Sequence, residues 1–163
     1  MVSALDARDR VRDARVLDLF AGSGGLGIEA LSRGAAWATF VERDADAVRA
    51  VADNLEATSF TPRAEVWRRP VPAALSAHAA GSPRAVPYDL VFVDPPYDLP
   101  LDALHDVLAA LVERSWLAPG ATVVVECARP LEPVPGLRTT WSRRFGDTLV
   151  VFLEPEESAT PAS

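Results

Sequence analysis

Short apolar runs alternate along the chain with longer segments in which apolar residues recur every three or four positions. In segment 45–57, Val48, Val51 and Leu55 fall on one face of a helix. The apolar runs predict strands at 14–19, 37–44, 64–68, 88–93 and 121–127, and the periodic segments predict helices at 26–33, 45–57, 71–80 and 101–111. Such alternation predicts a parallel sheet with right-handed crossovers and helices on both faces.

The last part of the chain breaks this alternation. Segments 137–144 and 148–154 both have the character of strands, and only the turn-forming letters FGD stand between them. The two segments therefore form an antiparallel hairpin at the sheet edge. We predict a mostly parallel seven-stranded α/β sheet in a single domain over residues 1–154, followed by a polar, disordered tail at 155–163.

The composition bears on the cellular compartment of this domain and on the ligands that it can bind. The 163 residues carry a formal net charge of −7, and all 16 basic residues are arginine. The charge argues against broad binding to nucleic acid but leaves room for a local basic patch. The single cysteine, Cys127, agrees with a reducing compartment, and no Cys/His cluster has metal-ligand spacing. Without a signal sequence or a membrane-length apolar run, we predict a cytoplasmic monomer that holds no metal and contacts no membrane.

A glycine-rich turn joins the first predicted strand to the first predicted helix. Residues 22–27, GSGGLG, match the pattern G-x-G-x-x-G, in which glycines allow a tight turn and a close approach of a ligand to the backbone. Glu42 follows about 20 residues later at the end of the second strand, where a carboxylate can accept hydrogen bonds from ribose hydroxyls. The pattern predicts a nucleoside cofactor, either a dinucleotide or S-adenosylmethionine.

Asp18, which directly precedes this turn, bears on the choice of cofactor. An anionic side chain suits the ammonium and sulfonium charges of S-adenosylmethionine, whereas it repels a pyrophosphate. The alternative is a structural role, in which backbone amides of the turn satisfy the carboxylate. We favour the cationic cofactor.

In the stretch VFVDPPYD, residues 91–98, a buried strand runs into an acid, two prolines and an aromatic ring. The prolines disfavour a helix, which leaves the backbone carbonyl of Pro95 free. This carbonyl and the Asp94 carboxylate can accept hydrogen bonds from the exocyclic amine of a nucleobase, and Tyr97 offers a face for stacking. The alternative is a plain break before the next helix. Because the glycine turn lies at the same sheet edge, we favour methyl transfer to an amino group.

The motif DPPY is typical of amino-methyltransferases, and the wider pattern resembles one family. The stretches VLDLFAGSGGLGIEALSRGA, FVERD, VFVDPPY, VVVE and RRFGDTLVVFL are similar to the RsmD family of 16S ribosomal RNA guanine-N2 methyltransferases, over residues 14–153. The resemblance implies a Rossmann-like class I methyltransferase fold with S-adenosylmethionine as cofactor. It implies as substrate a specific guanine of 16S rRNA, within an assembly intermediate of the small ribosomal subunit.

The resemblance also implies roles for particular residues. Asp18 and the backbone of residues 21–25 would hold the methionine part of the cofactor, and Glu42 would hold its ribose. The implied substrate-facing set is Asp94, Pro95, Pro96 and Tyr97. The implied cofactor-binding set is Asp18, Phe20, Ala21, Gly22, Ser23, Gly24, Gly25, Glu42, Arg43, Arg69, Pro70 and Asp94.

Two features depart from the family pattern. Family members begin with a basic segment that carries RNA contacts and part of a lid over the active site. Here residues 1–13 resemble only the end of that segment, and we interpret them as the remnant of an N-terminal helix. In addition, Pro70 stands where the family has an acid that contacts adenine, so main-chain groups around Arg69 would take over this contact.

Several alternatives stay open on the sequence alone. A DNA adenine-N6 methyltransferase shares the motif DPPY, and a truncated chain that binds the cofactor without turnover fits the short N-terminal segment. A dinucleotide oxidoreductase fits only the glycine turn. For Arg143 and Arg144, contact with RNA phosphate and a solvated strand edge are both compatible with the pattern.

Overall fold

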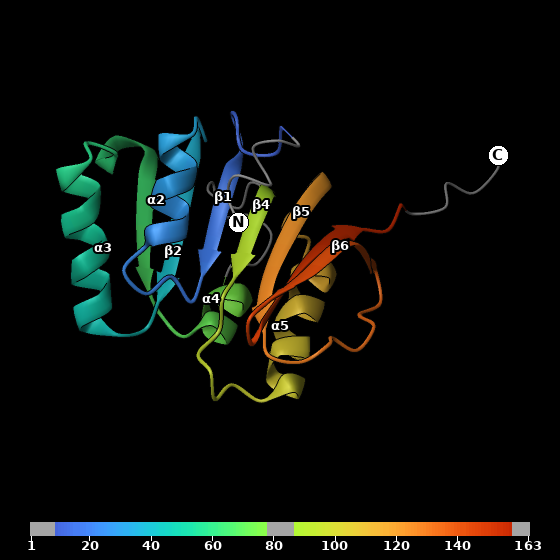
Figure 1. Ribbon diagram of the computed structural model, residues 1–163. Helices are drawn as coiled ribbons and strands as arrows, with labels where there is room; N and C mark the ends of the chain where they lie inside the picture. Colours follow the sequence, from blue (N-terminus) through green and yellow to red (C-terminus); the bar gives the residue numbers. More distant parts are fainter. Residues whose placement is uncertain (1–8, 78–86, 158–163) are drawn as a thin grey trace.

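A seven-stranded sheet forms the centre of the protein in the computed structural model, which describes residues 9–77 and 87–157 (Figure 1). The strands are β1 (Arg15–Leu19), β2 (Trp37–Glu42), β3 (Ala64–Arg68), β4 (Tyr88–Val93), β5 (Leu117–Cys127), β6 (Leu137–Phe145) and β7 (Thr148–Pro155). Their order is β3-β2-β1-β4-β5-β7-β6. Strands β1 to β5 run parallel, and β7 is antiparallel to both β5 and β6. The predicted mostly parallel sheet with a terminal hairpin is confirmed.

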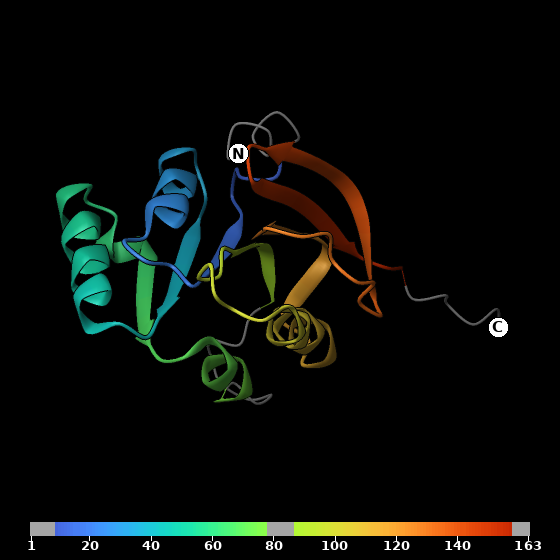
Figure 2. The ribbon, with the colours of Figure 1, turned by 60° about the horizontal axis from the view of Figure 1, so that its bottom comes forward.

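Helices cover both faces of this sheet, as predicted (Figure 2). They are α2 (Gly25–Ser32), α3 (Ala45–Ala57), α4 (Val71–Ala77) and α5 (Leu101–Glu113), with a short 3-10 helix, η1, at Thr61–Arg63. Alternate residues of the buried strands face opposite layers, because side chains alternate along a strand. Val91 and Val93 pack in the core beneath α4 and α5, whereas Leu90 and Phe92 pack in the core beneath α2 and α3.

The hairpin brings a distant part of the chain to the carboxyl edge of the parallel strands. In the antiparallel pairing of β5 with β7, Glu126 lies opposite Val150 and Cys127 lies opposite Leu149. The β6–β7 turn at Gly146 and Asp147 therefore lies just beyond the end of β5. This places turn residues next to the motif DPPY, which follows β4.

Several element boundaries differ from the sequence predictions, most of all the start of β5, at Leu117 rather than 121. Strand β2 ends at Glu42 rather than 44, because Asp44 caps α3 by accepting a hydrogen bond from the backbone N–H of Ala47 at 2.9 Å. Residues 9–13 form a turn, so the predicted helix remnant is wrong for them: Asp9 and Asp13 both have φ near +60°, which an α-helix excludes. Strand β7 extends to Pro155, one residue into the predicted tail.

The rest of the predicted N-terminal remnant and of the predicted tail, residues 1–8 and 158–163, lies outside the described residues, as does the end of the predicted helix 71–80. None of the described helices is both long and apolar enough to cross a bilayer.

Gly27 allows α2 to lie close to β2, and we expect Gly27→Ala to destabilise the protein by about 1–3 kcal/mol. An added Cβ would lie 2.8 Å from Cζ of Phe40 and closer still to its Cε1. Phe40 is fully buried, so the ring has little room to move. Gly25→Ala is the matched control, because a Cβ added at Gly25 would meet no other atom within 4 Å. Urea denaturation of both variants measures the difference, and equal midpoints would contradict the tight packing.

Candidate active site

The glycine turn and the motif DPPY meet at one edge of the sheet, because β1 and β4 are adjacent parallel strands. Two cavities open at this edge, and both are bounded by Asp94 and Pro96. The first cavity, of about 680 Å³, extends towards the ends of β1 and β2. The second cavity, of about 550 Å³, extends towards the end of β5 and the β6–β7 turn. Asp94 thus stands between two spaces large enough for separate ligands.

The first cavity collects part of the predicted cofactor-binding set. Its lining includes Phe20, Glu42, Arg43, Arg69, Pro70 and Asp94. The remaining members, Asp18 and residues 21–25, do not line it. The backbone N–H of Arg69 donates to the carbonyl of Glu42 at 3.1 Å, so the loop after β3 is tied to the end of β2. Pro70 follows at the cavity wall and presents no acid there.

The glycine turn is held in shape by the side chain of Glu42, from the end of β2. Phe20 and Gly22 both have φ of +58°, and Gly24 has φ of +85°, so the chain turns sharply in the left-handed region. The carboxylate of Glu42 accepts hydrogen bonds from the backbone N–H groups of Gly22 at 3.0 Å and of Asp44 at 2.8 Å. Glu42 therefore links the turn to the start of α3, while its carboxylate still borders the first cavity.

Asp18 is buried beneath the turn, with 1% of its surface exposed. Its Oδ2 accepts a hydrogen bond from the backbone N–H of Gly27, in the first turn of α2, at 3.1 Å. Burial raises the pKa of Asp18 from 3.8 to about 8, and the charges of Asp94 and Glu42 act in the same direction, against the hydrogen bond from Gly27. The amide contact matches the structural alternative for Asp18, and the raised pKa indicates a site in which a nearby cation would be favourable.

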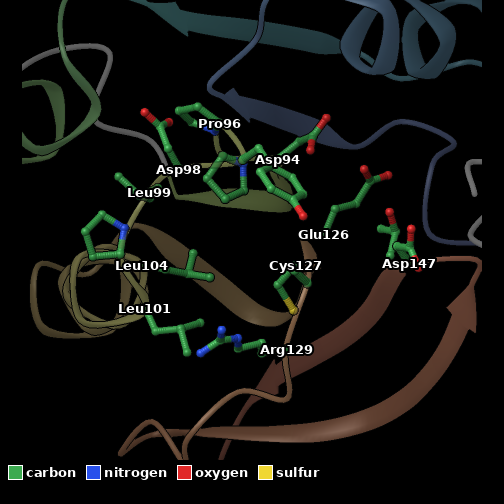
Figure 3. Close-up of a pocket in the computed structure, with 15 residues that line it drawn as sticks. Asp94, Pro96, Asp98, Leu99, Leu101, Leu104, Glu126, Cys127, Arg129 and Asp147 are labelled. Carbon is green, nitrogen blue, oxygen red and sulfur yellow. The ribbon is translucent and has the colours of Figure 1, made fainter.

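The second cavity gathers the substrate-facing set, Asp94, Pro95, Pro96 and Tyr97, with residues from two other strands (Figure 3). Tyr97 is 95% exposed, so its ring is available for stacking. The segment after Pro96 is turned back by a hydrogen bond from the backbone N–H of Leu99 to the carbonyl of Pro96 at 3.0 Å. The chain runs without a helix from Asp94 to Pro100, as the prolines predict.

Glu126, at the end of β5, shares the second cavity with Asp94. Their carboxyl groups interact, so each affects the pKa of the other. Partial burial raises the pKa of Glu126 from 4.5 to about 7, and the charge of Asp94 acts in the same direction. Burial also raises the pKa of Asp94, although its interaction with Glu126 acts against the shift. Both acids therefore keep a proton to higher pH than exposed carboxyl groups do.

Arg143 and Arg144 lie on β6, close to the mouth of the second cavity but not in its lining. Both are exposed, and the guanidinium of Arg143 lies over the ring of Phe145 at 5.2 Å from its centroid. The aromatic ring is half exposed as well. Cationic and aromatic surface thus continues outward from the cavity.

The sequence interpretation missed Glu126, the turn residue Asp147 and Thr148 at the start of β7, all of which line the second cavity. One signal was available for Glu126. Glu126 follows a run of valines, as Asp94 follows an apolar run. Both acids therefore lie at the carboxyl end of a buried parallel strand. No group of three or more His, Cys, Asp or Glu side chains that could hold a metal ion occurs within residues 9–77 and 87–157.

Comparison with known families matches residues 3–154 to the family described as conserved hypothetical protein 95. The chain belongs to this family. The resemblance to the RsmD methyltransferases is confirmed, because relatives of that kind share the same region. The family match covers every strand of the sheet except the last residue of β7.

Two curated relatives and one solved structure illustrate the similarity. The putative rRNA methyltransferase YlbH of Bacillus subtilis is 44% identical over 118 residues, which are 72% of this chain and 61% of the relative. Ribosomal RNA small subunit methyltransferase D of Escherichia coli is 39% identical over 130 residues, which are 80% of this chain and 61% of the relative. The chain thus spans 61% of the length of these relatives.

The solved structure is a putative methyltransferase from Escherichia coli, 32% identical, with a TM-score of 0.82 over 96% of this chain and 84% of that chain. This agreement confirms the predicted Rossmann-like class I methyltransferase fold.

Proposed function

We propose that this protein is an S-adenosylmethionine-dependent methyltransferase that modifies the exocyclic N2 amino group of a guanine in 16S ribosomal RNA. The observation that carries the proposal is the position of Asp94 between two cavities, one bordered by Glu42 and the other by Tyr97. A methyl donor in the first cavity and a base in the second would meet at this carboxylate. The relatives' names, rRNA methyltransferase and small subunit methyltransferase, support the substrate class.

The residues around the first cavity fit S-adenosylmethionine in charge. Glu42 and Asp94 line this cavity, where Glu42 offers carboxylate oxygens for ribose hydroxyls and the partly buried Asp94 favours a cationic ligand. Asp18 does not line the cavity, but it lies close enough to both acids for their charges to raise its pKa. Gly22, in the glycine turn, has no side chain, and the space that a Cβ would fill is open, with no other atom within 4 Å. Phe20 and Pro70 add apolar surface on which an adenine ring could lie. Four acids line the cavity against two arginines, Arg43 and Arg69, so a pyrophosphate would meet net negative charge.

The chemistry needs positioning more than covalent participation by the protein. When bound, S-adenosylmethionine supplies a methyl group on a sulfonium, whose sulfur retains the bonding electron pair as the methyl leaves. Asp94 and the carbonyl of Pro95 accept hydrogen bonds from the amine, which turns its lone pair towards the methyl carbon. The new N–C bond leaves a proton to be lost from nitrogen. The carboxylate of Asp94 takes this proton and passes it to water at the open mouth of the second cavity.

The second cavity fits a single base taken out of its stack. Tyr97 provides an exposed ring for stacking, and base stacking on an aromatic side chain contributes about 1–3 kcal/mol. Arg143 and Arg144 would meet the phosphates that flank the base. With a net charge of −7, we infer that folded RNA within a small-subunit assembly intermediate is the substrate, rather than free RNA. Small subunits are assembled in the cytoplasm, so we propose that the protein acts there. We also propose that it acts as a monomer.

The first test is isothermal titration of the chain with S-adenosylmethionine. We expect Glu42→Gln to weaken binding roughly 10- to 100-fold, because hydrogen bonds to a charged acceptor contribute about 1.5–3 kcal/mol. Glu56→Gln, an exposed acid on α3, is the matched control. Transfer of labelled methyl groups to small-subunit particles, followed by nucleoside analysis, then tests the base. The proposal fails if the folded chain does not bind the cofactor, or if the label appears on another nucleoside.

A further inference from the structure

Glu126 has no role in the chemistry described above, although it lines the second cavity together with Asp94. Its position is fixed by strand pairing. Val93 of β4 and Val125 of β5 are register partners in a parallel pair, so Asp94 and Glu126, which follow them, lie at the same level of the sheet edge. The register of the two strands therefore makes the two carboxyl groups neighbours, and Figure 3 shows both side chains at the same end of the cavity.

The pair of carboxyl groups matches one base edge in particular. The Watson–Crick edge of guanine presents two adjacent donors, the N1–H and the N2 amino group. Adenine presents its amino group next to an unprotonated ring nitrogen, which is an acceptor. A carboxylate beside Asp94 can accept from the guanine N1–H, whereas it would face the lone pair of the adenine nitrogen. Hydrogen bonds to this edge are the means by which enzymes read a flipped base.

We infer that Glu126 determines base specificity by accepting a hydrogen bond from the guanine N1–H while Asp94 accepts from the N2 amine. The inference rests on the proposed function, because it needs a guanine in the second cavity. It assigns to Glu126 the choice of base and leaves methyl transfer to Asp94.

Half-burial of Glu126 gives this contact its discriminating power. An acceptor that is partly removed from water loses more when its donor is missing than an exposed acceptor does. Tyr97 holds the base by its face and would accept any base, since every base has a face on which to stack. Discrimination therefore has to come from groups that meet the base edge, and Glu126 joins Asp94 there.

The test uses 2-aminopurine, which keeps the reacting amine but has an unprotonated N1. The position that the wild-type chain methylates is first mapped by mass spectrometry, and small-subunit particles are then reconstituted with guanine or 2-aminopurine at that position. We expect the wild type to prefer guanine roughly 10- to 100-fold in kcat/KM. Glu126→Ala should lower kcat/KM for guanine by that factor and leave the value for 2-aminopurine within about threefold, so that the preference disappears.

Glu126→Gln provides a second variant that keeps the size of the side chain. An amide can turn either its oxygen or its NH₂ group towards N1, so the preference for guanine should fall here as well. Glu132→Gln, an exposed acid in the loop between β5 and β6, should keep the wild-type preference. Fluorescence of 2-aminopurine reports base binding without turnover, and Glu126→Ala should bind this base at least as tightly as the wild type.

The outcomes separate the two proposals. If the wild type methylates neither base, the proposed function is wrong and the inference falls with it. If the wild type methylates guanine but both Glu126 variants slow guanine and 2-aminopurine equally, only the role of Glu126 in base choice is wrong. A lost preference with retained binding of 2-aminopurine supports the inference.

Discussion

Asp94→Asn is expected to lower kcat for methyl transfer by on the order of 10³-fold, while the affinity for S-adenosylmethionine changes by less than about fivefold. Asparagine keeps the size of the side chain and one oxygen acceptor, but it loses the charge that attracts the amine and cannot take the released proton. The amide NH₂ group would also point a donor at a base amine that needs an acceptor. Single-turnover transfer of labelled methyl groups to small-subunit particles measures the rate, and isothermal titration measures the affinity.

Asp106→Asn is the matched control for this variant, because Asp106 is an exposed acid on α5 outside both cavities. It should transfer methyl groups at the wild-type rate. Two results would contradict the role given to Asp94. Retention of more than a third of the wild-type rate would mean that the carboxylate does not act on the amine. An equal loss of cofactor affinity and rate would instead make Asp94 a cofactor ligand.

The parts of this architecture that could be predicted are those that depend on local sequence. The glycine turn and DPPY lie where apolar runs end, and such runs mark buried strands whichever neighbours they pair with. Strand β3, helix α3 and strand β4 therefore have the predicted bounds. The end of β2 was misplaced because a capping residue, Asp44, has no apolar signature and competes with strand propensity only once α3 forms.

The parts that could not be predicted depend on pairing between distant strands. Glu126 meets Asp94 only because Val93 and Val125 are register partners, and a shift of one residue would send Glu126 to the opposite face. Asp147 reaches the second cavity because β7 inserts between β5 and β6. The burial of Asp18 follows from the close approach of α2 to the sheet at Gly27; the glycine pattern permits this approach but does not show which acid it covers. Nonlocal geometry therefore decided which acids gather at the site.

Asp18→Asn is expected to make the free protein more stable at neutral pH, although it removes a charge from the site. The pKa of Asp18 is raised to about 8 by burial, whereas in the unfolded chain it is near 3.8. Between these two values the folded state binds a proton that the unfolded state has released, so wild-type stability falls as pH rises from about 4 to 8. Asparagine can still accept from the Gly27 N–H and has no such titration. One pKa unit corresponds to about 1.4 kcal/mol, so the gain at pH 7 is of the order of a few kcal/mol.

Urea denaturation of the wild type and Asp18→Asn at intervals from pH 4 to pH 8 measures the effect as a difference between the two curves. The difference should be near zero at pH 4 and grow with pH, while Asp106→Asn should follow the wild type throughout. Parallel curves would show that Asp18 has the same pKa in the folded and the unfolded protein, so that burial does not raise it.

The proposed cofactor reverses the effect of the Asp18 charge, from unfavourable in the free protein to favourable in the complex. A sulfonium and an ammonium nearby favour the ionised form, so binding should release a proton and tighten as pH rises towards 8. Asp18→Asn should lose this pH dependence, because the group that is unfavourable in the empty fold is the one that a cationic ligand would stabilise.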